Sequence, residues 1–429
     1  MQKEYSGSRQ IVFVLKVTII FFGYIFIINH FYIKVFTPSF MPKPDHIVND
    51  FASYYVASKL LLQGEIPYRS LDKHRTIELS SDEMQNWDIN KKIIPAYIYP
   101  TFLAAVISPL TKLPFNQARF IWELFCLVTF FGVVGFTFFL LGKQIKFDFT
   151  SLIIIGVFFA SMPTLETITQ GQINYQILLL ILLAFYFQKQ NKPILGGILL
   201  GIATLIKVSP IIMLLYFLYK KDFKFIQSFM IFLILSLSLL YILFPNVDFT
   251  FISSVLPSIS SIPSLNNKAI SVWWQYLFLD NEYINPVIIS PITAKIFTIT
   301  TAIAILIITY ILFFKGRKNT SDSNPKKLLL EYVVLILSLM LLQPYLEIHH
   351  LVFSFIAIAF IVNFYSNQKA QILEITLLII SFILINGRGY NSFEKLGAHW
   401  YSIFISNPQI IGLIILLSLL FRIYKRHFA

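Results

Sequence analysis

The sequence predicts an all-α polytopic membrane protein, and three observations favour this fold class. Of the 429 residues, 57% are hydrophobic and only 13% are charged, whereas soluble domains carry about 25% charged residues. Apolar runs long enough to cross a bilayer, which takes roughly 17 to 25 helical residues, recur from residue 11 almost to the C-terminus. Short Lys- and Arg-rich segments separate these runs, as is typical of cytoplasmic loops.

Composition and the first apolar run indicate which kind of membrane protein this is. Residues 11–36 form a longer apolar run than a signal peptide has, and no small-residue cleavage site follows, so we expect a retained anchor. The positive-inside rule accounts for the net charge of +13 without a nucleic-acid partner. The single Cys126 excludes an internal disulfide and a cysteine metal cluster. Abundant Ile, Phe, Lys and Asn suggest an AT-rich bacterial genome, hence a multi-pass protein of the bacterial inner membrane.

The basic segments predict the topology. The positive-inside rule places them all in the cytoplasm, so an even number of crossings must separate any two of them. They comprise residues 1–9, 142–146, 188–192, 220–224, 315–327, 367–369 and 422–427. The connections that then face outside are 169–174, 245–285, 343–350 and 387–402.

Two intervals do not fit a simple pair of crossings. As one helix, residues 193–219 would span about 40 Å and leave the next basic segment on the wrong side. Two short helices meeting near Lys207 restore the parity, and such helices are tolerated where protein or a cavity covers their ends. The proline-rich residues 94–113 are predicted to be re-entrant or interfacial.

The predicted architecture is one integral membrane domain over residues 1–429, with about twelve transmembrane helices, some short or re-entrant. Both termini are expected in the cytoplasm. Residues 37–118 form the first outer loop, with juxtamembrane and re-entrant helices, and residues 245–286 form the second.

Asp50 is the leading polar candidate of the first outer loop. It precedes residues 51–62, whose apolar positions recur at helical spacing. Asp is a favoured helix N-cap, which would explain this position without any chemistry. The functional interpretation is a catalytic carboxylate at the membrane surface, where partial burial would raise its basicity.

The predicted outer connections supply three further groups of candidates. Gln170, Gln172 and Asn174 are amides near a helix start that suit sugar hydroxyls, although capping and loop solvation would explain one or two of them. Asn266 and Asn267 belong to a polar, turn-prone platform in the second outer loop. His349 and His350 point about 100° apart on a helix, which disfavours a shared metal ion, so one is expected to act as a base or hydrogen-bond a substrate.

Lys207 is another candidate, because it interrupts an apolar stretch where a cation is costly. A phosphate is its natural partner. Snorkelling of the side chain to the membrane interface is the structural alternative. The topology predicts a deep external cavity with Lys207 at its floor.

In this order, these residues resemble the pattern of glycosyltransferase family 87, the polyprenol-phosphate-mannose-dependent mannosyltransferases of the GT-C superfamily. The resemblance runs from about residue 45 to residue 355. Its motifs are Asp50-Phe51 with Tyr54-Tyr55-Val56-Ala57 and Gly64-Glu65-Ile66-Pro67-Tyr68; Tyr99-Pro100; Gly171-Gln172-Ile173-Asn174; Gly196-Gly197 through Ala203, Lys207 and Pro210; Ser264-Leu265-Asn266-Asn267; and Gln343-Pro344 with His349-His350.

The resemblance implies a GT-C fold and an inverting membrane hexosyltransferase. The donor would be a polyprenyl-phosphate sugar carrying a mannose-like hexose, and the acceptor a glycan or glycolipid on the extracytoplasmic face. Lys207 would bind the donor phosphate, and Tyr54 and Tyr99 join the substrate-binding candidates. Asp50 leads as general base, before His349 and then His350. No cofactor and no metal are expected, and Gln343-Pro344, where the family often has Ser-Pro, leaves the acceptor open.

Two other classes are compatible with the residues. A secondary transporter would also use broken helices and an intramembrane lysine. Another envelope enzyme, a polysaccharide or acyl transferase, would also use external histidines. The predicted outer position of Asp50 and the histidines favours a transferase over a transporter, whose coupling carboxylates commonly lie near the membrane midplane.

Overall fold

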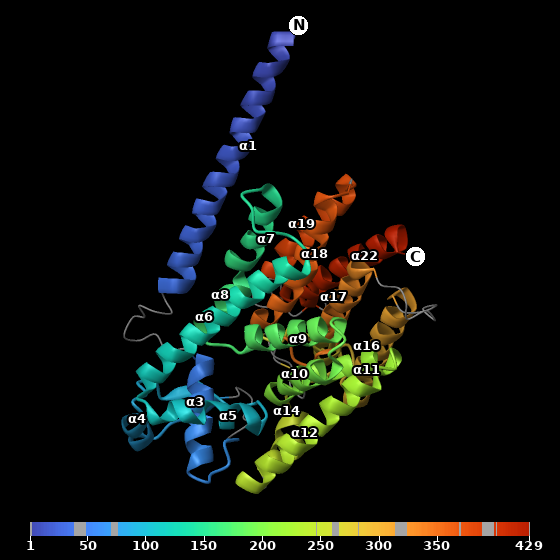
Figure 1. Cartoon of the computed structure of the whole chain (residues 1–429). Helices are drawn as coiled ribbons and strands as arrows, with labels where there is room; N and C mark the ends of the chain where they lie inside the picture. The colour runs from blue at the N-terminus through green and yellow to red at the C-terminus, as the bar shows by residue number, and fades with distance from the viewer. Residues whose placement is uncertain are drawn as a thin grey trace.

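The computed structural model is almost entirely helical (Figure 1). It describes residues 2–37, 49–69, 76–245, 247–259, 266–281, 283–313, 324–368, 370–387, 399 and 401–428. Residues 315–323 of the basic segment at 315–327, most of the connection at 387–402 and the Ser264-Leu265 part of one family motif therefore lie outside the described residues. The same holds for residues 38–48 and 70–75 of the first outer loop.

The N-terminal run forms one long helix, α1 (Gln2–Phe31), which continues into η1 (Tyr32–Phe36). Figure 1 shows that its N-terminal end extends well beyond the other helices. Large apolar side chains such as Phe22 and Phe26 are exposed on it, as on a helix that faces lipid. Near its other end, the Phe31 ring stacks on Phe130 of the main bundle, with 5.3 Å between the ring centroids.

The predicted first outer loop folds into short elements that lie away from both termini (Figure 1). They are α3 (Asn49–Leu62), β1 (Thr76–Glu78), α4 (Ser81–Trp87), β2 (Ile93–Pro95), α5 (Thr101–Ile107) and η2 (Ser108–Lys112). Within residues 94–113, α5 and η2 together are too short to cross a bilayer alone. That this segment is re-entrant or interfacial stays a prediction. The antiparallel β1–β2 hairpin is a small departure from the predicted all-α class.

The central helices carry the breaks that reach the site. They are α6 (Phe115–Leu140), α7 (Phe149–Phe159), α8 (Met162–Thr169), α9 (Asn174–Lys189), α10 (Pro193–Ile206), η3 (Ser209–Met213), α11 (Leu214–Tyr219) and α12 (Phe223–Leu243). As predicted, residues 193–219 are broken at Lys207, which has extended backbone angles between α10 and η3. With 14 residues, α10 reaches only about 21 Å.

Glycines let α10 pack closely against α12. A Cβ atom on Gly197 would lie 2.0 Å from Ser228 Oγ and 2.4 Å from the Phe225 carbonyl oxygen. Small residues at such contacts allow two helix backbones to approach each other within a membrane. The Gly196-Gly197 motif therefore has a packing role, and it fixes the helix that ends at Lys207.

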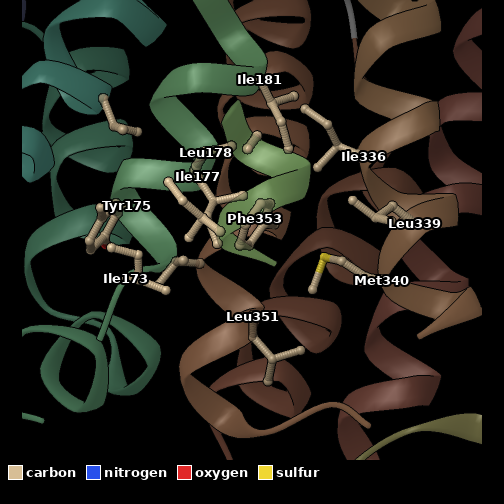
Figure 2. Close-up of a cluster of buried hydrophobic side chains, with 14 of the residues drawn as sticks. Ile173, Tyr175, Ile177, Leu178, Ile181, Ile336, Leu339, Met340, Leu351 and Phe353 are labelled. Carbon is tan, nitrogen blue, oxygen red and sulfur yellow. The ribbon is translucent and has the colours of Figure 1, made fainter. Parts of the chain in front are cut away.

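The C-terminal half closes the bundle. Its elements are α13 (Val247–Thr250), η4 (Phe251–Val255), α14 (Leu256–Ser258), α15 (Ile270–Phe278), α16 (Pro291–Phe313), α17 (Pro325–Leu342), η5 (Ile348–Ser354), α18 (Phe355–Ser366), α19 (Ile372–Asn386), α21 (Ser402–Ser406) and α22 (Pro408–His427). Figure 2 shows buried side chains of α9, α17 and η5 meeting in one apolar cluster, with Phe353 between Ile177 and Met340. This cluster supports the turn that carries His349 and His350.

Among the described residues, six helices are long and apolar enough to cross a membrane, and the pair α7–α8, bent by 46°, would make a seventh. The six are Val14–Phe36, Phe115–Leu140, Phe223–Leu243, Pro291–Ile311, Ile348–Ser366 and Pro408–His427. The remaining apolar helices, including α10 and α19, are shorter. The predicted total of about twelve, and the cytoplasmic termini, therefore stay predictions.

Several basic loops lie together at one end of the helices. The loop before α7 contacts α1 and α18, since Tyr24 donates to the Lys146 carbonyl at 3.1 Å and Asn363 donates to the Leu141 carbonyl at 3.4 Å. The loop after α11 contacts α17 through Lys220, whose Nζ lies 3.1 Å from Glu331 Oε2. From this end, α10, α17 and the central α9 run to the breaks at Lys207, Gln343 and Gln172. The basic loops and the breaks thus lie at opposite ends.

Candidate active site

A cavity of about 490 Å³ lies where the breaks meet. Its walls come from the first outer loop, the α8–α9 connection, the Lys207 break, the α13–α14 segment and residues 343–350. The polar and charged lining residues are Asp50, Ser53, Thr76, Tyr99, Gln172, Lys207, Ser209, Asn266, Gln343, Tyr345, Glu347, His349 and His350. Phe251, Leu256 and Ile259 supply much of one apolar wall.

The geometry of a helix end places Gln172 in this cavity. Gly171 has a φ of +67°, which is unfavourable for residues with a Cβ atom. Its N–H donates to Ile168, and the Gln172 N–H donates to Thr167 at 2.8 Å. This pair of bonds is the Schellman ending of α8. The glycine of the Gly171-Gln172 motif thus turns the chain so that Gln172 faces the cavity.

Gln172 organises the polar wall around Asp50. Its Oε1 accepts hydrogen bonds from the hydroxyls of Tyr54 and Tyr99, both at 3.1 Å. With the oxygen engaged in this way, the amide nitrogen is the donor that remains for the Asp50 carboxylate. The Asp50 N–H donates to the Gln170 carbonyl at 3.2 Å, so the backbone of α3 is also tied to this connection.

Burial and charge set the proton affinity of Asp50. Desolvation is the main cause that raises its pKa, to about 7, and the nearby Glu347 carboxylate adds to this effect. The hydrogen bond from Gln172 and the charge of Lys207 act in the opposite direction. A carboxyl group with a pKa near neutrality suits a general base. Because α3 begins at Asn49, Asp50 lies inside its first turn and not at the predicted N-cap.

Lys207 and the two histidines form the other polar wall. The Lys207 Nζ contacts His350 Nε2 and lies 5.9 Å from the centroid of the Tyr99 ring. His349 has a different partner, because its Nε2 lies 3.2 Å from Glu347 Oε2. The two imidazole rings are 4.4 Å apart and nearly perpendicular. Adjacent in sequence, they therefore face different groups.

Several predicted substrate-binding residues lie behind the cavity wall. Asn174 is fully buried and donates to the His349 carbonyl at 3.2 Å. Asn267 donates to the Pro344 carbonyl at 3.1 Å and accepts from the Leu346 N–H at 3.0 Å. Tyr54 is fully buried beneath Gln172, and Gln170 contributes its carbonyl to Asp50. These four residues position the wall, whereas Asn266 and Tyr99 line it.

Glu347 is the main site residue that sequence reasoning missed. Its carboxylate holds His349 and accepts a hydrogen bond from the Tyr345 hydroxyl at 2.5 Å, while its N–H donates to His350 Nδ1 at 2.9 Å. Its position two residues before His349 was the available signal. Only the fold, however, shows that it shares a cavity with Asp50 and Lys207.

The fold and the cavity define a many-helix membrane protein with a carboxylate and a lysine in one site. The model of glycosyltransferase family 87 matches residues 97–344, more than half of the chain, so the chain belongs to that family. This match confirms the resemblance drawn from the motifs. It covers Tyr99, Gln172 and Lys207, whereas Asp50 and the histidines lie outside the matched residues.

Two curated relatives carry the name polyprenol-phosphate-mannose-dependent alpha-(1-2)-phosphatidylinositol pentamannoside mannosyltransferase. The protein from Mycolicibacterium smegmatis is 33% identical over 123 residues, which are 28% of this chain and 29% of the relative. The protein from Mycobacterium tuberculosis is 28% identical over 121 residues, 28% of this chain and 27% of the relative. The chain thus matches less than a third of each relative's length. No solved structure matches the chain.

Proposed function

We propose that the chain is a membrane hexosyltransferase that moves a mannose-like hexose from a polyprenyl-phosphate sugar to a glycan or glycolipid, with inversion. The observation that carries the proposal is the pairing of Asp50 and Lys207 in one cavity. Transfer from a phosphate needs a base for the acceptor and a cation for the leaving group, and the cavity offers both. Membership of the family and the names of the relatives support the same chemistry.

In the proposed step, the wall with Asp50 activates the acceptor and the wall with Lys207 binds the leaving phosphate. The acceptor hydroxyl oxygen attacks the anomeric carbon of the hexose, while its proton passes to the Asp50 carboxylate. The bond between the anomeric carbon and the phosphate oxygen breaks, and polyprenyl phosphate leaves with the electron pair. Lys207 stabilises the negative charge on the leaving phosphate. Because attack and departure occur on opposite faces of the sugar carbon, its configuration inverts.

The proposed location is a bacterial inner membrane, with the cavity facing outside. The support is the arrangement of charge, since basic loops lie at the end of the helices opposite to the cavity. Basic loops of membrane proteins are retained in the cytoplasm. The acceptor would then be an envelope glycan or glycolipid on the extracytoplasmic face.

The proposal is tested with the full chain in lipid nanodiscs and a panel of polyprenyl-phosphate hexoses. Donor cleavage in the presence of membrane glycolipids is expected for at least one hexose. Asp50→Asn should lower the rate by roughly 10²- to 10⁴-fold, the usual contribution of a general base. Asp82→Asn, an exposed carboxylate of the same loop, is the matched control and should keep the rate.

Three outcomes would count against parts of the proposal. Full activity of Asp50→Asn would remove Asp50 from the mechanism. A product with the anomeric configuration of the donor, read by NMR, would contradict inversion. Movement of an intact sugar across the membrane without donor cleavage would instead support a transporter.

A further inference from the structure

The tautomer of His350 follows from its hydrogen bonds. The ring is buried, with 4% of its surface exposed. The backbone N–H of Glu347 donates to His350 Nδ1 at 2.9 Å. A backbone N–H can only donate, so Nδ1 is the acceptor, and the proton of the neutral imidazole must sit on Nε2.

The protonated nitrogen of His350 points at a second donor. Its Nε2 contacts the Nζ of Lys207, and an ammonium group has hydrogens but no lone pair to offer. Among the residues that the structure describes, no carboxylate forms an ion pair with Lys207. Glu347 and Asp50 are close enough to attract its charge electrostatically. The ammonium group of Lys207 and the Nε2–H of His350 are thus two hydrogen-bond donors that face each other on the cavity wall. An anionic oxygen placed between them could accept a hydrogen bond from each.

We propose that Lys207 and His350 together bind the phosphate of a lipid monophosphate, with the Nε2–H of His350 as the second donor to the phosphate oxygens. The inference rests on the proposed function and refines it, because it takes His350 out of the list of candidate bases. Its neighbour His349 has a different partner, since its Nε2 lies 3.2 Å from Glu347 Oε2. The adjacent histidines therefore have separate roles, and the donor phosphate lies beside His350.

Two substitutions of His350 separate the hydrogen-bond donor Nε2–H of its ring from the hydrogen-bond acceptor Nδ1. In His350→Gln, the side-chain amide nitrogen reaches about where Nε2 lies and can still donate to a phosphate. In His350→Asn, the shorter side chain can still accept from the Glu347 N–H but presents no donor beside Lys207. A hydrogen bond to a charged group corresponds to about a tenfold change in affinity or more.

The test measures binding of a short-chain polyprenyl monophosphate to the full chain in nanodiscs, with the matching polyprenol as the probe that lacks phosphate. We expect His350→Asn to weaken monophosphate binding by about tenfold, with little change for the polyprenol. His350→Gln should recover most of the loss. In the Lys207→Met background, His350→Asn should cost much less, because the phosphate that both residues hold is already displaced.

The outcomes distinguish this inference from the proposed function. If the wild-type chain binds the monophosphate no better than the polyprenol, the polyprenyl-phosphate donor itself is wrong. If it prefers the monophosphate while His350→Asn and His350→Gln bind equally well, the second-donor role of His350 is overturned.

A measurement on the wild-type chain covers the case in which His350→Asn does not fold. Nitrogen-15 NMR of labelled histidines, assigned with the spectrum of His350→Gln, reports the tautomer directly. We expect a protonated Nε2 whose signal shifts on addition of the monophosphate. A proton on Nδ1, or a signal that the monophosphate leaves unchanged, would contradict the proposal.

Discussion

Asp50 shares its cavity with a second carboxylate, and this neighbour affects when it can act as a base. Burial, and after it the charge of Glu347, raise the pKa of Asp50 to about 7. Gln172 opposes this effect with a hydrogen bond, and its orientation is held by Tyr54 and Tyr99. The proton affinity of one carboxyl group is thus set by several side chains from separate segments.

The rate of transfer should therefore rise with pH through about 7. Below this pH, Asp50 is protonated and cannot accept the proton of the acceptor hydroxyl, whereas above it the carboxylate is available. Glu347→Gln removes a charge that raises the pKa of Asp50, so it should move the acidic limb of the profile to lower pH. The measurement is the pH profile of kcat/KM for the acceptor.

The control for this experiment is Asp82→Asn, which removes an exposed charge from the same loop and should leave the midpoint in place. An acidic limb that stays at the same pH in Glu347→Gln would show that the titrating group is not Asp50 beside Glu347.

Sequence reasoning found Asp50 and Lys207 but missed Glu347, and it did not show which of the amide side chains reach the cavity. A lysine or carboxylate within a mostly apolar chain is costly, so Lys207 and Asp50 could be recognised from their surroundings in the sequence. An uncharged amide side chain does not stand out from its sequence surroundings in this way. Asn174 and Asn267 have the composition of ligand-binding residues, yet both bond to backbone carbonyls behind the wall. Only tertiary packing decides which side of a wall an amide occupies.

At the scale of elements, the ending of α8 controls the site. Gly171 adopts a φ of +67°, and a left-handed conformation costs roughly 1–2 kcal/mol for a residue with a Cβ atom. Gly171→Ala should therefore lower the melting temperature and also lower kcat/KM, because relief of the strain would shift Gln172 away from Asp50. The measurements are thermal unfolding and initial rates of transfer.

Gly142→Ala is a matched control for this change. Gly142 has a φ of +63° and ends α6 with the same pair of backbone hydrogen bonds, but it does not line the cavity. It should show a similar loss of stability with an unchanged rate for the folded protein. Equal losses of activity in the two variants would refute a special role for the α8 ending.

Elements were predictable where topology constrained them. The parity of the basic loops required a break within residues 193–219, and the break occurs at Lys207. The β1–β2 hairpin was not predictable in this way, because three-residue strands are too short to show an alternating pattern. Their pairing depends on contacts between Thr76–Glu78 and Ile93–Pro95, which are distant in the sequence.

At the scale of the whole molecule, the side of the membrane that the cavity faces is open to direct labelling. Cys126 is the single cysteine and is buried, so the unmodified chain gives a low background. In intact bacterial cells, Lys92→Cys beside the hairpin should react with a membrane-impermeant maleimide. Lys189→Cys, in the exposed basic connection at the opposite end, should react only after permeabilisation. The reverse pattern would show that the proposed orientation is inverted.

The number of crossings is difficult to predict from the sequence. Residues within α9, α10 and α19 are apolar enough for a membrane, but these helices have 16, 14 and 15 residues. Hydropathy detects such segments without showing whether each spans the bilayer alone or ends inside the protein. The sequence therefore predicts where the chain turns better than it predicts how many full spans result.

Two of the segments that line the cavity are attached to the bundle in different ways. The first loop, which carries Asp50, is fixed through its backbone to the Gln170 carbonyl. The apolar wall of Phe251, Leu256 and Ile259 belongs to the α13–α14 segment, whereas Asp50 belongs to α3. Substitutions in that segment can therefore change the shape of the cavity while the proton-accepting group keeps its place. Substitutions there should therefore change which acceptors fit the cavity more than they change the proposed proton transfer to Asp50.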